Sequence, residues 1–182
     1  MARVTALFVA PAGGNPMRAI ETVEAVADRG LRGDRYFNGS GYYSPFDVCQ
    51  VTLIAEEAIE TIDRGFDIDL SAGQHRRNIV IEGVAVEELL EHRFRIGEAE
   101  FVGTRPRPPC AHLEDLTAAD GVARALTDGR GGICADVTAS GRIAVDDSIE
   151  IVESLDRTDA IIDRLRRKHG DDAEDNQHVG EE

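Results

Sequence analysis

One cysteine of the sequence stands in a setting that favours chemistry. Cys110 follows two consecutive prolines, and His112 lies two residues further on. Arg105 and Arg107 lie just upstream, and a thiol near cationic groups loses its proton more readily. The thiolate is both the nucleophilic form of cysteine and a soft metal ligand. Cys110 and His112 are therefore candidate catalytic residues, and Cys110 is also the candidate metal ligand. The alternative for a lone cysteine is a small buried residue.

Arginines beside glycines form a second set of candidates, in the segments 33–35, 76–78 and 129–132. Glycine lets backbone amides approach an anion closely, and arginine offers two parallel donors to a phosphate group. For any one segment, turn chemistry with a surface arginine is the simpler explanation. Together, the three segments predict one local basic pocket in an acidic chain.

Several other catalytic patterns are missing from the sequence. It contains no phosphate-binding Gly-x-x-x-x-Gly-Lys-Ser/Thr loop and no Gly-x-Ser-x-Gly elbow. Zinc is not expected, because the Cys110-x-His112 pair has no second pair to complete four ligands. His75 and His92 are isolated, and we predict that both lie on the surface. Pyridoxal phosphate needs a lysine for its covalent linkage, and the sole candidate, Lys168, lies near the polar C-terminal stretch, so we do not expect this chain to bind it covalently.

The composition limits the partners and the compartment. A net charge of −15 argues against nucleic acid as a partner, because phosphates demand basic surfaces. The sequence has no apolar run of membrane-spanning length and no signal-peptide pattern, which predicts a cytoplasmic location and no membrane association. Three cysteines are too few for a disulfide framework, and Cys49 and Cys134 are interpreted as buried residues of strands. Only one of the 20 basic residues is a lysine. This composition suits a halophilic protein, and codon usage that favours arginine explains it equally well.

The hydrophobic pattern predicts a mainly β domain with a few short helices. Strands are expected at 5–9, 48–54, 77–81, 99–104, 131–137, 142–145 and 148–152. Helices are expected at 56–64 and, apart from Gly121, at 116–127. Segment 20–27 fits a strand or a helix, and 105–110 is expected to be an extended loop because it contains three prolines. Short strands with glycine turns indicate a β-barrel or a sandwich. We predict one domain over residues 1–153, followed over 154–182 by a short helix and a disordered acidic tail.

The order of the short motifs identifies a family that the sequence resembles. The motifs lie at 30–35, 50–54, 77–79, 94–97, 105–106, 109–113, 130–132, 141–143 and 146–149. In this order and spacing they resemble the MOSC domain, the C-terminal domain of molybdenum cofactor sulfurase. The resemblance covers roughly residues 3 to 153, and no single motif carries it alone.

This resemblance implies a MOSC-type β-barrel, found either free-standing or fused to larger enzymes. In that family the cysteine after the prolines is regarded as a sulfur carrier or a molybdenum ligand, and some members reduce N-hydroxylated compounds. Carried over, it makes Cys110 the thiolate ligand of molybdenum or the persulfide carrier. The candidate residues for binding the molybdenum cofactor (molybdopterin) are Arg35, Arg77, Asn78, Arg105, Arg130, Gly131 and Gly132.

The chain also departs from the larger members of that family. It lacks a separate N-terminal β-barrel domain, a desulfurase domain and an iron–sulfur cysteine cluster. We therefore expect a sulfur donor, such as a cysteine desulfurase, or a redox partner. The sequence leaves three functions open: an oxidoreductase, a sulfur carrier, and a non-catalytic module that binds an anionic cofactor. It does not predict the substrate or the oligomeric state.

Overall fold

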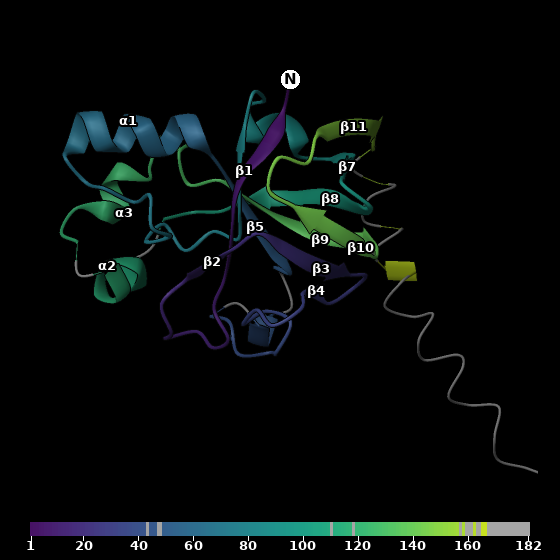
Figure 1. Ribbon diagram of the computed structural model, residues 1–182, viewed down its shortest axis with the longest axis horizontal. Coiled ribbons are helices and arrows are strands. Elements are labelled where there is room, and N and C mark those ends of the chain that lie inside the picture. The colour runs from purple at the N-terminus through teal and green to yellow at the C-terminus, as the bar shows by residue number, and fades with distance from the viewer. Residues whose placement is uncertain are drawn as a thin grey trace, which may run out of the picture.

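Two β-sheets make up most of the protein (Figure 1). The computed structural model describes residues 1–42, 44–46, 49–109, 111–117 and 119–156, with Thr158, Ile162, Leu165 and Arg166. Its strands are β1 (Arg3–Val9), β2 (Arg18–Ile20), β3 (Thr22–Val26), β4 (Gly30–Leu31), β5 (Val51–Ala55), β6 (Ile79–Glu82), β7 (His92–Ile96), β8 (Ala99–Pro106), β9 (Ile133–Ala139), β10 (Gly141–Ala144) and β11 (Ile149–Ser154). Its helices are α1 (Glu56–Phe66), α2 (Ala111–Thr117) and α3 (Val122–Ala125), with 3-10 turns at Ser44–Phe46 and Val86–Leu89.

The larger sheet is curled into a half-barrel. Its strand order is β11-β7-β8-β9-β5-β6-β1-β2, and every neighbouring pair is antiparallel except β5 and β6, which are parallel. At one end the sheet comes back upon itself, because the Val4 amide donates to the Asp147 carbonyl and the Ile149 amide donates to the Ala2 carbonyl. The smaller sheet, of order β10-β3-β4, packs against β8 and β9.

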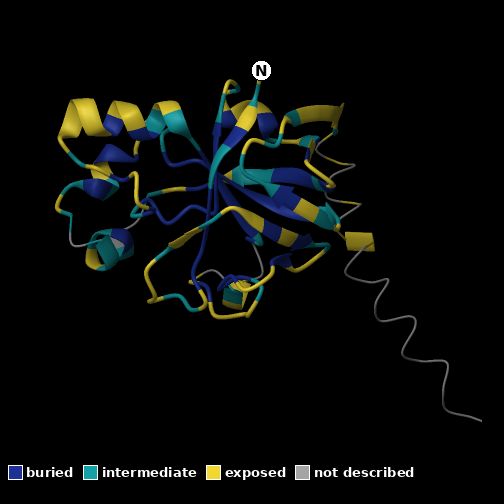
Figure 2. Cartoon of the chain, in the orientation of Figure 1, coloured by how far each residue is buried: buried dark blue, intermediate teal, exposed yellow. Residues whose placement is uncertain are grey.

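The curl of the sheet encloses the main hydrophobic core. Its centre is formed by the inward side chains of the long strands, among them Phe94 and Phe101, whose rings stack with centroids 5.6 Å apart. A second apolar cluster lies on the other face of β5 and β6, under the helices. Figure 2 shows the central strands buried on both faces. Residues in β5 and β6 are consequently almost all buried, as expected for a parallel pair covered on both sides.

The three α-helices lie together on one side of the half-barrel (Figure 1). Helix α1 has Glu56 and Glu57 in its first turn, where acidic side chains are favoured by the helix dipole, and it buries Ile59 and Ile62. Segment 116–127, predicted to be helical apart from Gly121, contains the last two residues of α2 and the whole of α3. Gly121 lies between the two helices in a left-handed conformation (φ 84°).

The structure also decides the conformation of two segments, 105–106 and 20–27. Strand β8 runs on through Arg105 and Pro106, which the sequence placed in a loop. A proline is tolerated at this point because it is the last residue of the strand, and the next amide, that of Arg107, resumes pairing with the Gly132 carbonyl at 2.8 Å. Segment 20–27, left open between strand and helix, contains β3. The predicted acidic tail lies almost entirely outside the described residues.

None of the helices described is both long enough and apolar enough to cross a membrane.

Candidate functional site

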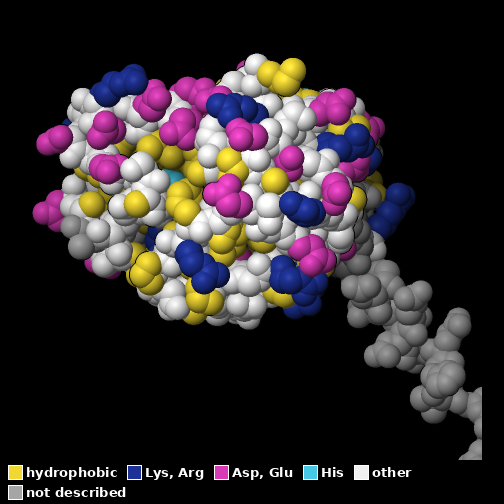
Figure 3. Space-filling model, in the orientation of Figure 1, with side chains coloured by type: hydrophobic (Ala, Val, Ile, Leu, Met, Phe, Trp, Pro, Cys, Tyr) yellow, Lys and Arg dark blue, Asp and Glu magenta, His cyan; other side chains and the backbone are white. Residues whose placement is uncertain are grey.

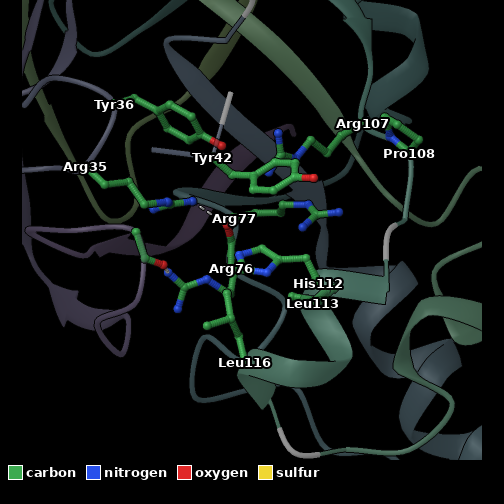
Figure 4. A pocket seen from close by; sticks show the side chains of 11 residues that line it. Arg35, Tyr36, Tyr42, Arg76, Arg77, Arg107, Pro108, His112, Leu113 and Leu116 are labelled. Atoms are coloured by element: carbon green, nitrogen blue, oxygen red, sulfur yellow. Dashed lines mark hydrogen bonds between the residues drawn. The ribbon is translucent and has the colours of Figure 1, made fainter. Parts of the chain in front are cut away.

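A small pocket opens where four loops meet helix α2 (Figure 4). The loops follow β1, follow β4, precede β6 and follow β8. The residues that line it are Gly13, Arg35, Tyr36, Tyr42, Arg76, Arg77, Arg107, Pro108, His112, Leu113 and Leu116. Four arginines in one pocket make it the basic site that the arginine–glycine pattern predicted in part.

Arg77 is the most deeply buried of these cations. Its Nε donates to the Gly131 carbonyl at 2.8 Å, and its Nη1 donates to the His75 carbonyl at 2.7 Å. Its Nη2 is buried and has no hydrogen-bond partner among the described residues. Burial, and secondly the charge of Arg107, lower the pKa of Arg77 to about 9. This guanidinium therefore has an unused donor and no carboxylate partner in the part of the chain that is described.

Arg76 and Arg35 approach the pocket from the neighbouring loops. Arg76 donates to the carbonyls of Asn15 and Gly13, both at 2.8 Å, and burial lowers its pKa. Arg35 donates to the Asp34 carboxylate at 3.0 Å and to the Arg76 carbonyl at 2.8 Å. Arg35 is thus paired with a carboxylate, whereas Arg76 and Arg77 donate to backbone carbonyls and bring positive charge to the pocket.

Aromatic rings form the rest of the wall. The guanidinium carbon of Arg107 lies 5.9 Å from the centre of the Tyr36 ring, and that of Arg35 lies 4.7 Å from it. Tyr42 stacks on His112 with ring centres 4.8 Å apart. In the view of Figure 4, Arg77 lies between Arg35 on one side and Arg107 on the other. A ligand with both an anionic group and a flat apolar part matches this lining.

His75 is buried, so its predicted surface position is wrong. Its Nδ1 accepts a hydrogen bond from the Arg77 amide at 2.8 Å, and Phe8 meets its ring edge-on with centroids 5.4 Å apart. Burial, and next the charges of Arg77 and Arg35, lower the pKa of His75 to about 3. The imidazole is therefore neutral at pH 7, which avoids adding another buried charge beside the arginines.

Asn78 holds strands together and does not line the pocket. Its side-chain oxygen accepts from the Thr52 amide at 3.1 Å and from the Thr52 hydroxyl at 2.9 Å, and its Nδ2 donates to the Phe8 carbonyl at 3.1 Å. These bonds tie β5 and β1 to the residue that follows the pocket arginines. Its role in binding a cofactor stays a prediction.

Gly131 and Gly132 lie behind the arginines and position them. The Gly131 carbonyl accepts from Arg77, and the Gly132 carbonyl accepts from the Arg107 amide. A side chain at either position would collide with backbone, that of Arg107 at Gly131 and that of Leu53 at Gly132. The two glycines thus permit the close approach on which the pocket depends.

Two candidate arginines are not part of the pocket lining. Arg130 donates to the Ala125 carbonyl at 2.7 Å and belongs to a different hollow, next to α1 and the turn Val86–Leu89. Arg105, on β8, lies beside Cys49 and Cys134, where its charge acts on both thiols. Their assignment as cofactor-binding residues stays a prediction.

Cys110 falls outside the described residues. Pro108 and His112, two residues before and after it in the sequence, both line the pocket. Among the residues that can be described, no group of three or more His, Cys, Asp or Glu side chains is placed to hold a metal ion. The sequence analysis did not single out Tyr36 or Tyr42, and it named Arg107 only as a cation upstream of Cys110. Arg76 was part of the candidate segment 76–78. Tyr36 directly follows the candidate Arg35 in the sequence, which was the available signal for it.

The half-barrel with an arginine-lined pocket beside short helices defines the class of protein, a small mainly β domain with a basic pocket. The sequence matches the model of the MOSC domain over residues 43–150, more than half of the chain, and the protein therefore belongs to the MOSC domain family. This confirms the predicted family and its fold.

Solved structures agree on the fold at low sequence identity. The YUAD protein from Bacillus subtilis superposes with a TM-score of 0.69 at 16% identity, covering 82% of this chain and 94% of its own. YiiM from Geobacillus stearothermophilus gives 0.64 at 15% identity, covering 91% and 86%. YiiM from Escherichia coli gives 0.62 at 17% identity, covering 92% and 94%. No curated protein matches the sequence significantly.

Proposed function

We propose that this MOSC protein binds the molybdenum cofactor in the arginine pocket, with Cys110 as the thiolate that ligates the metal. The observation that carries the proposal is Arg77, a buried cation with no carboxylate partner among the described residues and one unused donor that a phosphate can take. Membership of the MOSC family suggests which cofactor to expect, and the arginines of the pocket provide the positive charge that would attract its phosphate.

The residues present fit such a ligand. Arg76 and Arg77 line the pocket and donate to backbone carbonyls, while the Asp34 carboxylate is paired with Arg35. A cation in a partly desolvated site attracts an anion far more strongly than one on the surface does. The phosphate of the cofactor is the anion assigned here to these guanidinium groups.

The aromatic wall takes the flat part of the ligand. Tyr42 and His112 already stack on each other, and Tyr36 is held against two guanidinium groups. The neutral His75 fixes the Arg77 backbone from behind and keeps water away from it. When bound, the cofactor supplies a redox-active metal centre, which favours an oxidoreductase.

Cys110 enters the proposal through its sequence position. It lies between two residues of the pocket lining, and a thiolate is the soft ligand that molybdenum chemistry suits. Arg107 lies three residues before it, and a nearby cation favours the thiolate. His112 is assigned as the group that moves a proton to or from the substrate.

Elemental analysis tests the proposal. Wild-type protein and the variants Cys110→Ala, Arg77→Met and Arg95→Met are purified from one host that makes the cofactor. Arg95, an exposed residue of β7, is the matched control. We expect near-stoichiometric molybdenum in wild type and Arg95→Met, and a loss of at least tenfold in the other two. Screening of N-hydroxylated compounds as substrates follows from that result.

Two other outcomes overturn the proposal in distinguishable ways. Wild-type protein without molybdenum, but with a sulfur atom on Cys110 that a reductant removes, supports the persulfide carrier and a desulfurase partner. Molybdenum retained in Cys110→Ala and lost in Arg77→Met supports a binding module in which the thiol is not a ligand.

A further inference from the structure

Two of the three cysteines lie against each other behind the wall of the pocket. Cys49 stands two residues before β5, and Cys134 is the second residue of β9. Their Sγ atoms are 2.7 Å apart, although the residues are 85 positions apart in the sequence. Both are buried, in a cluster whose third member is the pocket residue Tyr36.

The surrounding backbone holds the two sulfur atoms in this position. Strands β5 and β9 are antiparallel neighbours, with Thr52 opposite Cys134. The Gln50 side chain accepts a hydrogen bond from the Val137 amide at 3.0 Å, which fixes the approach of Cys49 to the sheet. A disulfide needs a sulfur–sulfur distance of about 2.05 Å, so closure requires an approach of only about 0.7 Å.

Their electrostatic settings differ, as they do in reactive cysteine pairs. A hydrogen bond from Cys49 lowers the pKa of Cys134, and the charges of Arg107 and Arg105 lower it further. Burial, followed by the neighbouring Cys134, raises the pKa of Cys49. One sulfur is thus the nucleophile and the other carries the proton.

We propose that Cys49 and Cys134 are a redox-active pair, which hydrogen peroxide closes to an intramolecular disulfide. The Cys134 thiolate attacks one oxygen of hydrogen peroxide, the O–O bond breaks, and a sulfenic acid and hydroxide form. The Cys49 sulfur then attacks the Cys134 sulfur, the S–O bond breaks, and the hydroxyl leaves with the Cys49 proton as water. The thiolate and the thiol together lose one proton and two electrons, and hydrogen peroxide becomes one water and one hydroxide, which takes up a proton from solvent.

Oxidation also changes the pocket. Closure removes the negative charge that Cys134 places beside Arg107, whose guanidinium belongs to the pocket lining. The oxidised form therefore binds anions more tightly than the reduced form. This consequence concerns the pocket of the proposed function, whereas formation of the disulfide does not depend on that function.

Peptide mapping of the full chain tests the pair directly. Trypsin does not cleave before proline, so the three cysteines fall in three different peptides, 36–64, 96–124 and 131–142. Wild type and Cys110→Ser are treated with hydrogen peroxide, denatured, alkylated and digested. We expect a cross-link between 36–64 and 131–142 that reductant reverses, and in Cys110→Ser the loss of both remaining free thiols.

Single variants separate the two roles. In Cys49→Ala, peroxide leaves a sulfenic acid on Cys134 that dimedone labels. In Cys134→Ala, Cys49 stays alkylatable at the same peroxide dose. The proposal is overturned if both thiols of wild type remain alkylatable, if the cross-link joins the 96–124 peptide instead, or if it forms only after denaturation. The peptide map of peroxide-treated wild type tests whether the disulfide forms, even if a variant fails to fold.

Discussion

The arginines of the pocket and the arginines of the outer surface have different partners. On the surface, Arg95 pairs with Glu100 at 2.8 Å and Arg32 pairs with Glu24 at 2.6 Å. In the pocket, Arg76 and Arg77 donate to backbone carbonyls. Carboxylates are abundant in a chain of net charge −15, and they are spread over the face seen in Figure 3. The difference shows that Arg76 and Arg77 are held in place by backbone carbonyls, with no ion pair to a carboxylate among the described residues.

The largest expected effect is on stability, and it comes from His75, the buried histidine behind the pocket. Besides burial, the charges of Arg77 and Arg35 contribute to the low pKa of this residue. The pKa of His75 is about 3 in the folded protein, against an ordinary value of 6.5. Between these values the unfolded chain binds one proton more, so stability falls as pH drops below 6.5 and the loss is complete near pH 3. Full loss amounts to about 5 kcal/mol for this group alone.

The His75→Gln variant isolates this contribution. Glutamine still offers an acceptor to the Arg77 amide but binds no proton. Denaturant unfolding at several pH values between 7 and 4 should show a shallower loss of stability for the variant. If the free energy of unfolding falls with pH equally in the two proteins, His75 binds its proton as readily in the folded state as in the unfolded state, which contradicts its burial.

Removing a pocket cation has the next largest effect. In wild type, inorganic phosphate should raise the free energy of unfolding, by about 2.7 kcal/mol at a hundred times its dissociation constant. Arg77→Met should lose most of this gain, because the donor that faces the anion is gone, and should keep much of its stability, because a buried unpaired charge is also gone. Thermal unfolding with and without phosphate measures both. Arg95→Met should respond to phosphate like wild type.

Salt is expected to act on the surface more than on the pocket. Potassium chloride screens the repulsion among exposed carboxylates, so stability should rise with its concentration. The rise should be the same in wild type and Arg77→Met, because it does not depend on the pocket. Unfolding curves at low and high salt provide the measurement. An unchanged stability would count against the halophilic interpretation of the composition.

Breaking one surface pair should have the smallest effect. Arg95→Ala and Glu100→Ala, separately and together, should give a coupling free energy of about 0.2 to 1 kcal/mol, because exposed ion pairs are weak. A double-mutant cycle from denaturant unfolding measures it. A coupling of several kcal/mol would remove the distinction drawn between surface and pocket arginines.

The fold could be read from the sequence wherever hydrophobic pattern and turn chemistry agreed. The predicted strand 5–9 lies within β1, and the predicted helix 56–64 lies within α1. Gly121 was noticed as an interruption, but its left-handed backbone, which splits the predicted helix into two, depends on the tertiary packing of α2 and α3.

The candidate site was harder to predict than the fold. Arg35 and Arg77, two of the predicted cofactor-binding residues, line one pocket, and their role in binding stays a prediction. Arg130 also stands beside glycines in the sequence, but its side chain lines a different hollow. Its neighbour Gly131 contributes to the pocket site through its carbonyl, which accepts a hydrogen bond from Arg77. His75 was misplaced because its immediate neighbours in the sequence, Gln74 and Arg76, are polar. Its burial follows from contact with Phe8, which is far away in the sequence.

The parallel pairing of β5 with β6 has a consequence for folding. Parallel neighbours need a long crossover, here α1 and the segment after it, and Arg76 and Arg77 stand at the end of that crossover. Partners of these guanidinium groups include carbonyls of the first loop and of Gly131, two residues before β9, so distant parts of the chain must already have docked. Contacts of such long sequence separation form late, because loop closure precedes them. Binding of the anion proposed for this pocket would therefore report that these distant segments have come together.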